Sequence, residues 1–438
     1  MLSKIKLSLK SINYKLYVTL LILGIMPTIY TTVRVFFVGQ LPSEWSFSIA
    51  GQLSWVNLIY EILNEAIILP LFFFVGNSKM SKSEITNRTH TGMIFSFVLY
   101  SLLSVGIIMF AKPLLLAMAT NTNIINESIS YIRIESIANI FSVLYQFVLV
   151  VLVVLNKPKY LYILTVTRLV LCLCIDTFLV STLPFSMNLG VNGIGVSNII
   201  VNAILFTLSL RLLFKEGISF FTKGTLDFSW LKQFFKVGGI SGVESFVRNI
   251  AYMVMISRMV NIVGEQGTYW VANNFIWGWL LLPVLQLGEL IKKEIAADTK
   301  NIQKNTLGYL VLTALISLSW FASIPLWKPF MSKVLGFEAV DKLFELVLLL
   351  IGFYVLYAFQ NVFDSTFYGL GKTNYMLFES VITNTIYYGI AFVLYITGMW
   401  TPTLTGIALL FGIGNAFDSL VSFVAYLYLL RKEKIKII

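Results

Sequence analysis

The sequence predicts an all-α polytopic membrane protein of about twelve transmembrane helices. Hydrophobic residues make up 58% of the 438 residues, whereas charged residues make up only 12%, about half of their share in a soluble domain. A single soluble core stops growing at roughly 250–300 residues. A chain this long and this apolar is therefore expected to be solvated by lipid along its whole length.

Twelve apolar stretches are long enough to cross a bilayer, which takes about 20 residues. The first follows Lys4, Lys6, Lys10 and Lys15, and because no small-x-small cleavage pattern comes after it, we expect a spanning helix rather than a secretory signal. A connector as short as 156–159 (NKPK) joins antiparallel neighbours, which predicts a helical bundle and not a barrel. The predicted spans lie at about 16–38, 52–74, 92–111, 134–155, 160–182, 193–213, 237–257, 269–291, 305–327, 343–368, 375–397 and 404–429.

The longest predicted cytoplasmic connector, 214–236, divides the chain into halves of six helices, 1–213 and 237–438. The segment 142–160 (SVLYQF…LNKPKY) is similar to 354–375 (YVLYAF…GLGKTNY), which places helix 4 opposite helix 10. Internal repeats of this kind are common in secondary transporters. We therefore predict two pseudo-symmetric six-helix bundles, related by an axis along the membrane normal.

Lysine and arginine fall mainly on one side of this predicted topology, and cytoplasmic loops are enriched in them. The chain is therefore expected in the cell membrane with both termini in the cytoplasm. Its net charge of +11 reflects this topology, since nucleic-acid binding would need a folded basic domain with base-stacking aromatics. The predicted outer loops carry only Lys112, Arg133, Arg258, Lys328, Lys333 and Lys342.

Cysteine and histidine give no sign of a metal site or a cofactor. Cys172 and Cys174 lie in an apolar run, and we interpret them as reduced packing residues. His90 is expected in a solvated polar connector without further ligands nearby. An intramembrane enzyme, which would need a nucleophile with a base or a metal cluster, is accordingly a remote alternative.

Ionisable residues inside the predicted spans are the main candidates for function, because each costs at least about 2.5–3.5 kcal/mol at bilayer depth. The acids outnumber the arginines, which suits a pathway for protons or cations. The acids are Glu61, Glu65, Asp176, Glu244, Glu289, Asp364, Glu379 and Asp418, and the arginines are Arg34, Arg168 and Arg248.

Each of these candidates also has a structural interpretation. Glu244 and the arginine at 248 have the i, i+4 spacing of an intrahelical ion pair. Glu61 and Glu65 share a helix face, where they either share a proton or have separate partners. Glu289 and Glu379 lie near predicted helix ends and are expected to reach the headgroups.

Three prolines interrupt predicted spans. Pro27, Pro70 and Pro283 remove backbone hydrogen bonds and bend helices, so they are candidate hinges. Gly238 and Gly242 permit close approach of a neighbouring helix.

Four segments carry a resemblance to a known family: Val33–Leu41 (VRVFFVGQL), Lys157–Phe178, Gly190–Asn198 (GVNGIGVSN), and Gln360 with Gly369–Thr373 (GLGKT). In order and spacing they resemble the multidrug and toxic compound extrusion (MATE) transporters over essentially the whole chain. The resemblance implies two six-helix lobes and export of small amphipathic, often cationic compounds in exchange for H⁺ or Na⁺. The resemblance implies no cofactor. We expect the lipid bilayer to surround the protein, and we expect no obligate protein partner.

The same resemblance assigns individual residues. Asp176 matches the family's helix 5 acid, and Asn198 falls on a polar position of helix 6. Arg34 stands where the family has its helix 1 acid, and the helix 10 acid of the sodium-coupled branch falls nearer Tyr357 than Asp364. The predicted ion and substrate pathway comprises Asp176, Arg34, Asn198, Glu61, Glu65, Glu244, Asp364, Gln360 and Tyr357.

The arginine in helix 1 leaves several interpretations open. Arg34 would hold an anionic substrate, pair with Asp176 as a switch, or anchor helix 1 at the headgroups. A lipid-linked oligosaccharide flippase of the same superfamily is the alternative function, but it would call for a more basic cavity than this excess of acids suggests.

Overall fold

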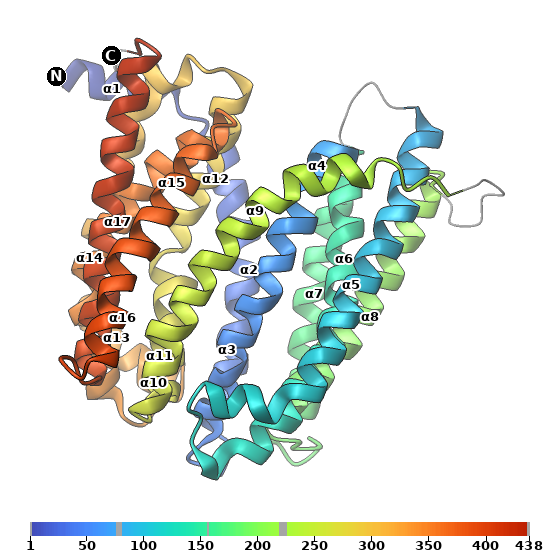
Figure 1. Cartoon of the computed structure of the whole chain (residues 1–438), viewed down its shortest axis with the longest axis vertical. Coiled ribbons are helices and arrows are strands. Elements are labelled where there is room, and N and C mark those ends of the chain that lie inside the picture. Colours follow the sequence, from blue (N-terminus) through green and yellow to red (C-terminus); the bar gives the residue numbers. More distant parts are fainter. Residues whose placement is uncertain (1, 76–80, 156, 219–225, 436–438) are drawn as a thin grey trace. The chain divides into compact units, whose positions relative to one another are not determined.

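The computed structural model describes residues 2–75, 81–155, 157–218 and 226–435. These residues form helices and no strands (Figure 1). The predicted all-α class is confirmed. The middle of the predicted connector 214–236, residues 219–225, lies outside the described residues.

The helices pack into two units, which are described separately. Unit 1 comprises Met1–Thr32 and Thr268–Ile438, and unit 2 comprises Val33–Gly267. These limits differ from the predicted halves 1–213 and 237–438, because the first helices pack with the C-terminal part and the seventh predicted span packs with the N-terminal part. The predicted halves describe a sequence repeat rather than packing, and they stay a prediction.

Unit 2 is built around α6, which packs against α5 and α8, with α7 against α8 and α9 against α3. Its elements are the second part of α2 (Tyr14–Gly39), α3 (Ser46–Leu63), η1 (Asn64–Ile68), α4 (Leu69–Val75), α5 (Lys82–Ala117), η2 (Thr122–Ile124), α6 (Ile125–Val154), α7 (Pro158–Leu179), α8 (Asn192–Lys215), α9 (Leu231–Tyr252), η3 (Met253–Ser257) and α10 (Arg258–Ile262).

Unit 1 is built around α14, which packs against α12, α13 and α17, while α1 packs against α13. Its apolar core includes Leu290, Tyr309, Phe367 and Tyr426. Its elements are α1 (Leu2–Ser11), the first part of α2, α11 (Gln266–Phe275), η4 (Ile276–Leu280), α12 (Leu282–Ala297), α13 (Asn301–Lys333), α14 (Val340–Gly369), α15 (Asn374–Ile382), η5 (Thr383–Tyr387), α16 (Tyr388–Ile396) and α17 (Leu404–Lys432).

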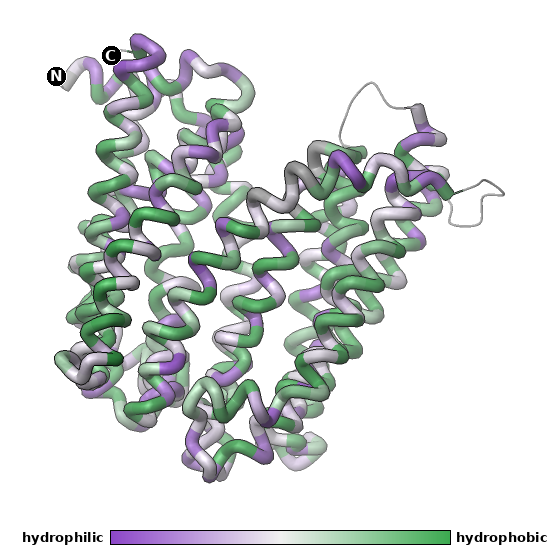
Figure 2. Tube along the Cα trace, viewed as in Figure 1, coloured by the Kyte–Doolittle hydropathy of each residue, from purple (hydrophilic) through white to green (hydrophobic). Residues whose placement is uncertain are grey.

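Among the described residues, nine helices are long and apolar enough to cross a membrane, and the bent pair Gln266–Leu280 and Leu282–Ala297 makes a tenth. Figure 2 shows hydrophobic residues along most of the length of these helices. The remaining predicted spans, 52–74 and 237–257, fall on α3–η1–α4 and α9–η3–α10, where π turns interrupt the helix. The chain is therefore a multi-pass membrane protein.

The helix α5 begins ten residues before the predicted span 92–111. Ser81 caps it, because its hydroxyl accepts a hydrogen bond from the Glu84 backbone N–H at 3.2 Å, as expected of an N-cap residue. His90 is consequently buried within α5, and the prediction that it lies in a solvated connector is wrong.

Two of the three candidate hinge prolines follow a break in a span. Pro70 comes two residues after the π turn η1, and Pro283 follows η4, where the two helices meet at 52°. A proline has no N–H to give to the preceding turn, and in membrane helices local π turns help to satisfy the backbone groups that a proline leaves without a partner. Pro27 lies inside the continuous helix α2. The hinge role of all three stays a prediction.

Candidate functional site

Arg34 and Asp176 meet in the interior of unit 2. The Arg34 Nε donates to Asp176 Oδ2 at 2.9 Å, and Nη2 donates to Oδ1 at 3.1 Å. The Asp176 side chain is 1% exposed and the Arg34 side chain 13%. Two parallel bonds of this kind fix both side chains, so in this structure Arg34 pairs with Asp176 and does not extend to the headgroups.

A second acid, Glu135, joins this pair. Glu135 is buried and accepts a hydrogen bond from Asn198 Nδ2 at 2.7 Å. It lies close enough to Arg34 and Asp176 to interact with both charges. The predicted residues Arg34, Asp176 and Asn198 are thus brought together, and we call them with Glu135 the inner site.

The local packing of four helices positions the inner site. Asp176 lies in the last turn of α7, and Asn198 lies in the second turn of α8. Gly193 lets these helices meet, because a Cβ there would lie 2.8 Å from the Leu179 carbonyl oxygen. Arg34 comes from α2, and Glu135 comes from the third turn of α6.

The inner site has one more carboxyl group than it has guanidinium groups. Burying an uncompensated charge costs several kcal/mol. One additional positive charge, a proton or a cation, would make the group neutral. The geometry therefore suits reversible binding of one cation.

Three of the predicted acids gather around Arg248 elsewhere in unit 2. The Arg248 guanidinium lies 2.5 Å from Glu65, 3.4 Å from Glu244 and 3.5 Å from Glu61. The predicted pair of Glu244 and Arg248 within one helix is present. Glu61 and Glu65 both lie within ion-pair distance of Arg248, and the two alternatives for these acids, a shared proton and separate partners, stay predictions.

The acids around Arg248 are more accessible than the inner site. The Glu61 side chain is 39% exposed and that of Arg248 is 40% exposed. Glu65 lies in the π turn η1, and π turns are frequent at functional sites. We call Glu61, Glu65, Glu244 and Arg248 the outer acidic group. It carries more acids than bases and is accessible, which suits attraction of a cation.

Unit 1 holds an acidic network of its own around Asp418. The Gln360 amide donates to Asp418 Oδ2 at 2.6 Å, and the Thr383 hydroxyl donates to Oδ1 at 2.6 Å. The Ser419 hydroxyl in turn donates to the Gln360 carbonyl oxygen at 2.8 Å. Predicted Gln360 is therefore part of a buried polar network, and its partner Asp418 comes from α17.

Asp364 and Glu379 extend this network. The Ser422 hydroxyl donates to Asp364 Oδ1 at 2.7 Å, and the carboxyl groups of Asp364, Glu379 and Asp418 lie close enough to interact electrostatically. Glu379 is 3% exposed, so the prediction that it reaches the headgroups is wrong. Within the described part of the chain, none of the three acids forms an ion pair with Lys or Arg.

Tyr357 lies on the same helix as Gln360 but packs in an aromatic cluster. Its ring lies 5.5 Å from that of Trp277 and 6.3 Å from that of Tyr354. Over the described ranges, no group of His, Cys, Asp and Glu side chains has the arrangement of a metal site.

Sequence reasoning missed Glu135 and underrated Glu379. Glu135 lies at the edge of the predicted span 134–155, and only the start of α6 at Ile125 shows that it is three turns inside a helix. The predicted list of intramembrane acids omitted it, although its position inside that span was a signal that could have found it. Glu379 lies near a predicted helix end, and nothing in the sequence shows that α14 and α17 cover it.

Comparison by sequence finds no relative. No family model matches the chain, and no curated protein sequence matches it.

Comparison by structure finds transporters. A multidrug resistance MATE family transporter of the MOP superfamily, in its inward-facing conformation, superposes with a TM-score of 0.69 at 17% identity, over 98% of each chain. The Vibrio cholerae MATE transporter VcmN gives 0.71 at 15% identity, over 99% of this chain and 98% of that one. A MATE in complex with MaD3S gives 0.66 at 18% identity, over 98% of each chain. The chain therefore has the fold of the MATE transporters, as the resemblance predicted.

Proposed function

We propose that this protein is a secondary active transporter that exports small amphipathic cations in exchange for H⁺ or Na⁺. The inner site is the observation that carries this proposal. In a fold shared with transporters, it buries two acids with one arginine and so has a place for one coupling cation.

The coupling step follows from the charge of the inner site. With a cation bound, Asp176 and Glu135 together balance Arg34 and the cation. When the cation leaves, no positive charge balances one of the two carboxylates. A conformation of the protein in which water solvates that carboxylate then becomes favourable. Cation binding and release thereby shift the balance between two conformations, as differential affinity requires.

The outer acidic group supports a cationic substrate. Three carboxylates surround one guanidinium there, and the group is accessible. A positively charged compound would be attracted to it, whereas an anion would be repelled.

Transport of a cationic dye into inverted membrane vesicles tests the proposal. We expect uptake driven by a proton gradient or by a sodium gradient, and the comparison identifies the coupling ion. Asp176→Asn should abolish gradient-driven uptake, because one carboxylate is then removed from the inner site. The control is Glu127→Gln, which changes an exposed acid of α6. Normal uptake by Asp176→Asn would refute the coupling assignment.

A further inference from the structure

A groove of about 780 Å³ lies between α15 and α17 in unit 1. Both helices belong to candidate membrane spans. Phe378 and Leu420 in its wall are 58% and 59% exposed, so in a bilayer they contact lipid rather than water. The groove therefore opens toward the membrane.

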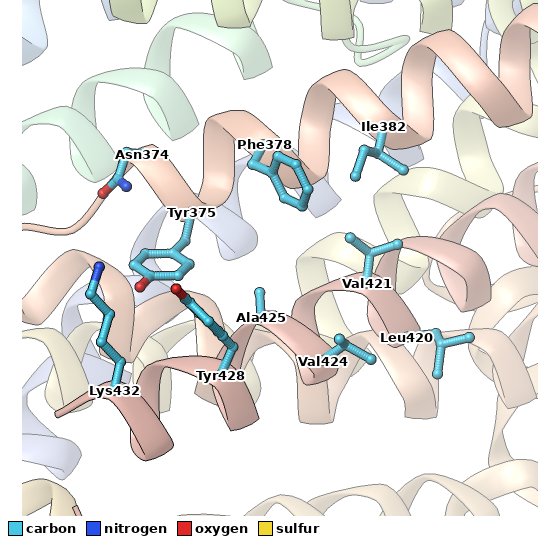
Figure 3. Close-up of a pocket in the computed structure, with 10 residues that line it drawn as sticks. All are labelled: Asn374, Tyr375, Phe378, Ile382, Leu420, Val421, Val424, Ala425, Tyr428 and Lys432. Carbon is cyan, nitrogen blue, oxygen red and sulfur yellow. The ribbon is translucent and has the colours of Figure 1, made fainter. Parts of the chain in front are cut away.

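The two ends of the groove differ in chemistry. Figure 3 shows apolar side chains such as Ile382, Val421 and Val424 toward one end. Toward the other end it shows the amino group of Lys432 near the phenol oxygens of Tyr375 and Tyr428, with Asn374 close by. An elongated ligand with an apolar tail and a polar head matches this division.

The polar end offers hydrogen-bond donors and one positive charge. Ammonium, phenol and amide groups all donate hydrogen bonds, and the ten lining residues include no Asp or Glu. The nearby Glu433 is neutralised by an ion pair with Lys372. Lys432 has no ion-pair partner among the described residues, and its Nζ lies 5.9 Å from the Tyr428 ring.

Packing also holds Tyr375 in place at the polar end of the groove. The Tyr375 ring stacks on Phe367 of α14 at 5.2 Å with an interplanar angle of 11°. The hydroxyl groups of Tyr375 and Tyr428 form no hydrogen bond to any other described side chain. They are free to donate to a ligand.

We infer that this groove binds a phospholipid with a negatively charged headgroup, with its phosphate at Lys432 and an acyl chain along the apolar wall. Basic pockets between transmembrane helices at the cytoplasmic side are suited to anionic lipid headgroups, and the predicted topology places Lys432 on that side. A cationic amphiphile would be repelled by Lys432, so this site differs in ligand class from the proposed transport pathway.

Native mass spectrometry of the purified protein with added phosphatidylglycerol or phosphatidylcholine tests the inference. We expect retention of phosphatidylglycerol in preference to phosphatidylcholine. Lys432→Gln should weaken phosphatidylglycerol binding about fivefold, the loss expected for one basic residue at an anionic surface. Arg431→Gln is the matched control, because Arg431 is the adjacent base and does not line the groove.

A second pair of variants tests the apolar wall. Val424→Trp should fill the groove and reduce lipid binding, whereas Leu427→Trp, on an exposed position of the same helix outside the groove, should not. Equal binding of the two lipids, or an equal loss in Lys432→Gln and Arg431→Gln, would overturn the inference. A dimer that Val424→Trp dissociates would also overturn it, because the groove would then be an interface between copies of the chain.

Discussion

Arg34 and Asp176 form a buried ion pair whose contribution to stability depends on which partner is removed. Burial of both charges costs solvation, and the two hydrogen bonds between them offset that cost. Loss of Asp176 leaves Arg34 with Glu135 as its remaining acid. Loss of Arg34 leaves the two acids facing each other without a base.

A double-mutant cycle tests this coupling. We expect Arg34→Gln to lower the free energy of unfolding by about 3–5 kcal/mol, and Asp176→Asn to lower it less, because Glu135 still compensates Arg34. The double variant should lose clearly less than the sum, because Asp176→Asn removes one of the two acids that Arg34→Gln leaves uncompensated. Thermal unfolding in detergent measures all four proteins. Strictly additive losses would show that the pair is not coupled.

A more exposed pair gives a prediction for pH. Lys157 Nζ lies 2.7 Å from Glu216 Oε2, and the Tyr160 hydroxyl donates to Oε1 at 2.8 Å. The bond from Lys157, followed by that from Tyr160, holds the pKa of Glu216 below its usual value. A lowered pKa in the folded state stabilises the fold above the unfolded pKa, and this contribution is lost as the pH falls through the folded pKa.

We therefore expect Glu216→Gln to unfold at a lower temperature than the wild type at pH 7, with the difference shrinking as the pH falls through the lowered pKa of Glu216. Unfolding curves of both proteins over a series of decreasing pH values check this. A difference for Glu216→Gln that persists at low pH would point to lost packing instead.

The residues of the inner site were largely predictable, and their arrangement was not. Asp176 and Arg34 stand out because ionisable groups are rare at bilayer depth, whereas Asn198 was assigned only through the resemblance to the MATE family. That Glu135 completes the site depends on where α6 begins, and capping at Asn121 and the turn η2 decide that. Asp364, Glu379 and Asp418 come from three helices, so their contact depends on packing that a hydropathy pattern does not encode.

At the scale of elements, the close approach of α9 to the π turn η1 depends on glycine. A Cβ at Gly238 would clash with the Ala66 carbonyl oxygen, and one at Gly242 would lie 2.9 Å from the Ala66 Cβ. Small residues permit such contacts between membrane helices. This contact also brings Arg248 of α9 to Glu65 of η1.

Two neighbouring glycines allow a matched test of this contact. Gly238→Ala should destabilise the protein by about 1–3 kcal/mol, because the methyl group overpacks the contact. Gly239→Ala should be neutral or stabilise by about 0.4–1 kcal/mol, since nothing lies within 4 Å of the Cβ position at Gly239. Thermal unfolding compares the two. Equal effects would mean that backbone entropy, and not packing, governs both sites.

Helix boundaries and breaks limited the prediction of elements. Apolar runs predicted the spans, since lipid leaves only a helix or a closed barrel to satisfy the backbone. The π turns η1, η3, η4 and η5 were not predicted, because they depend on contacts with neighbouring helices and lie in stretches whose apolar composition is unchanged.

At the scale of the whole molecule, each interrupted span either crosses the bilayer or enters and leaves by the same face, and the two cases give different topologies. Between Met187 and Asp298 lie α8 and two broken segments, α9–η3–α10 and α11–η4–α12. If each of the three crosses the bilayer, Met187 and Asp298 are on opposite sides. If either broken segment enters and leaves by the same face, they are on the same side.

The distribution of Lys and Arg predicts three crossings, with Met187 outside and Asp298 in the cytoplasm. Both residues are exposed, so single cysteines there should react readily in a protein whose Cys172 and Cys174 have been replaced by Ala. We expect Met187→Cys to react with a membrane-impermeant maleimide in intact cells, and Asp298→Cys to react only after permeabilisation. Labelling of both from outside would show that one broken segment is re-entrant, and the reverse pattern would show an inverted topology. The side of the C-terminus follows from the same result, because four candidate spans lie after Asp298. The side of the N-terminus follows if the interrupted segment α3–η1–α4 also crosses the bilayer.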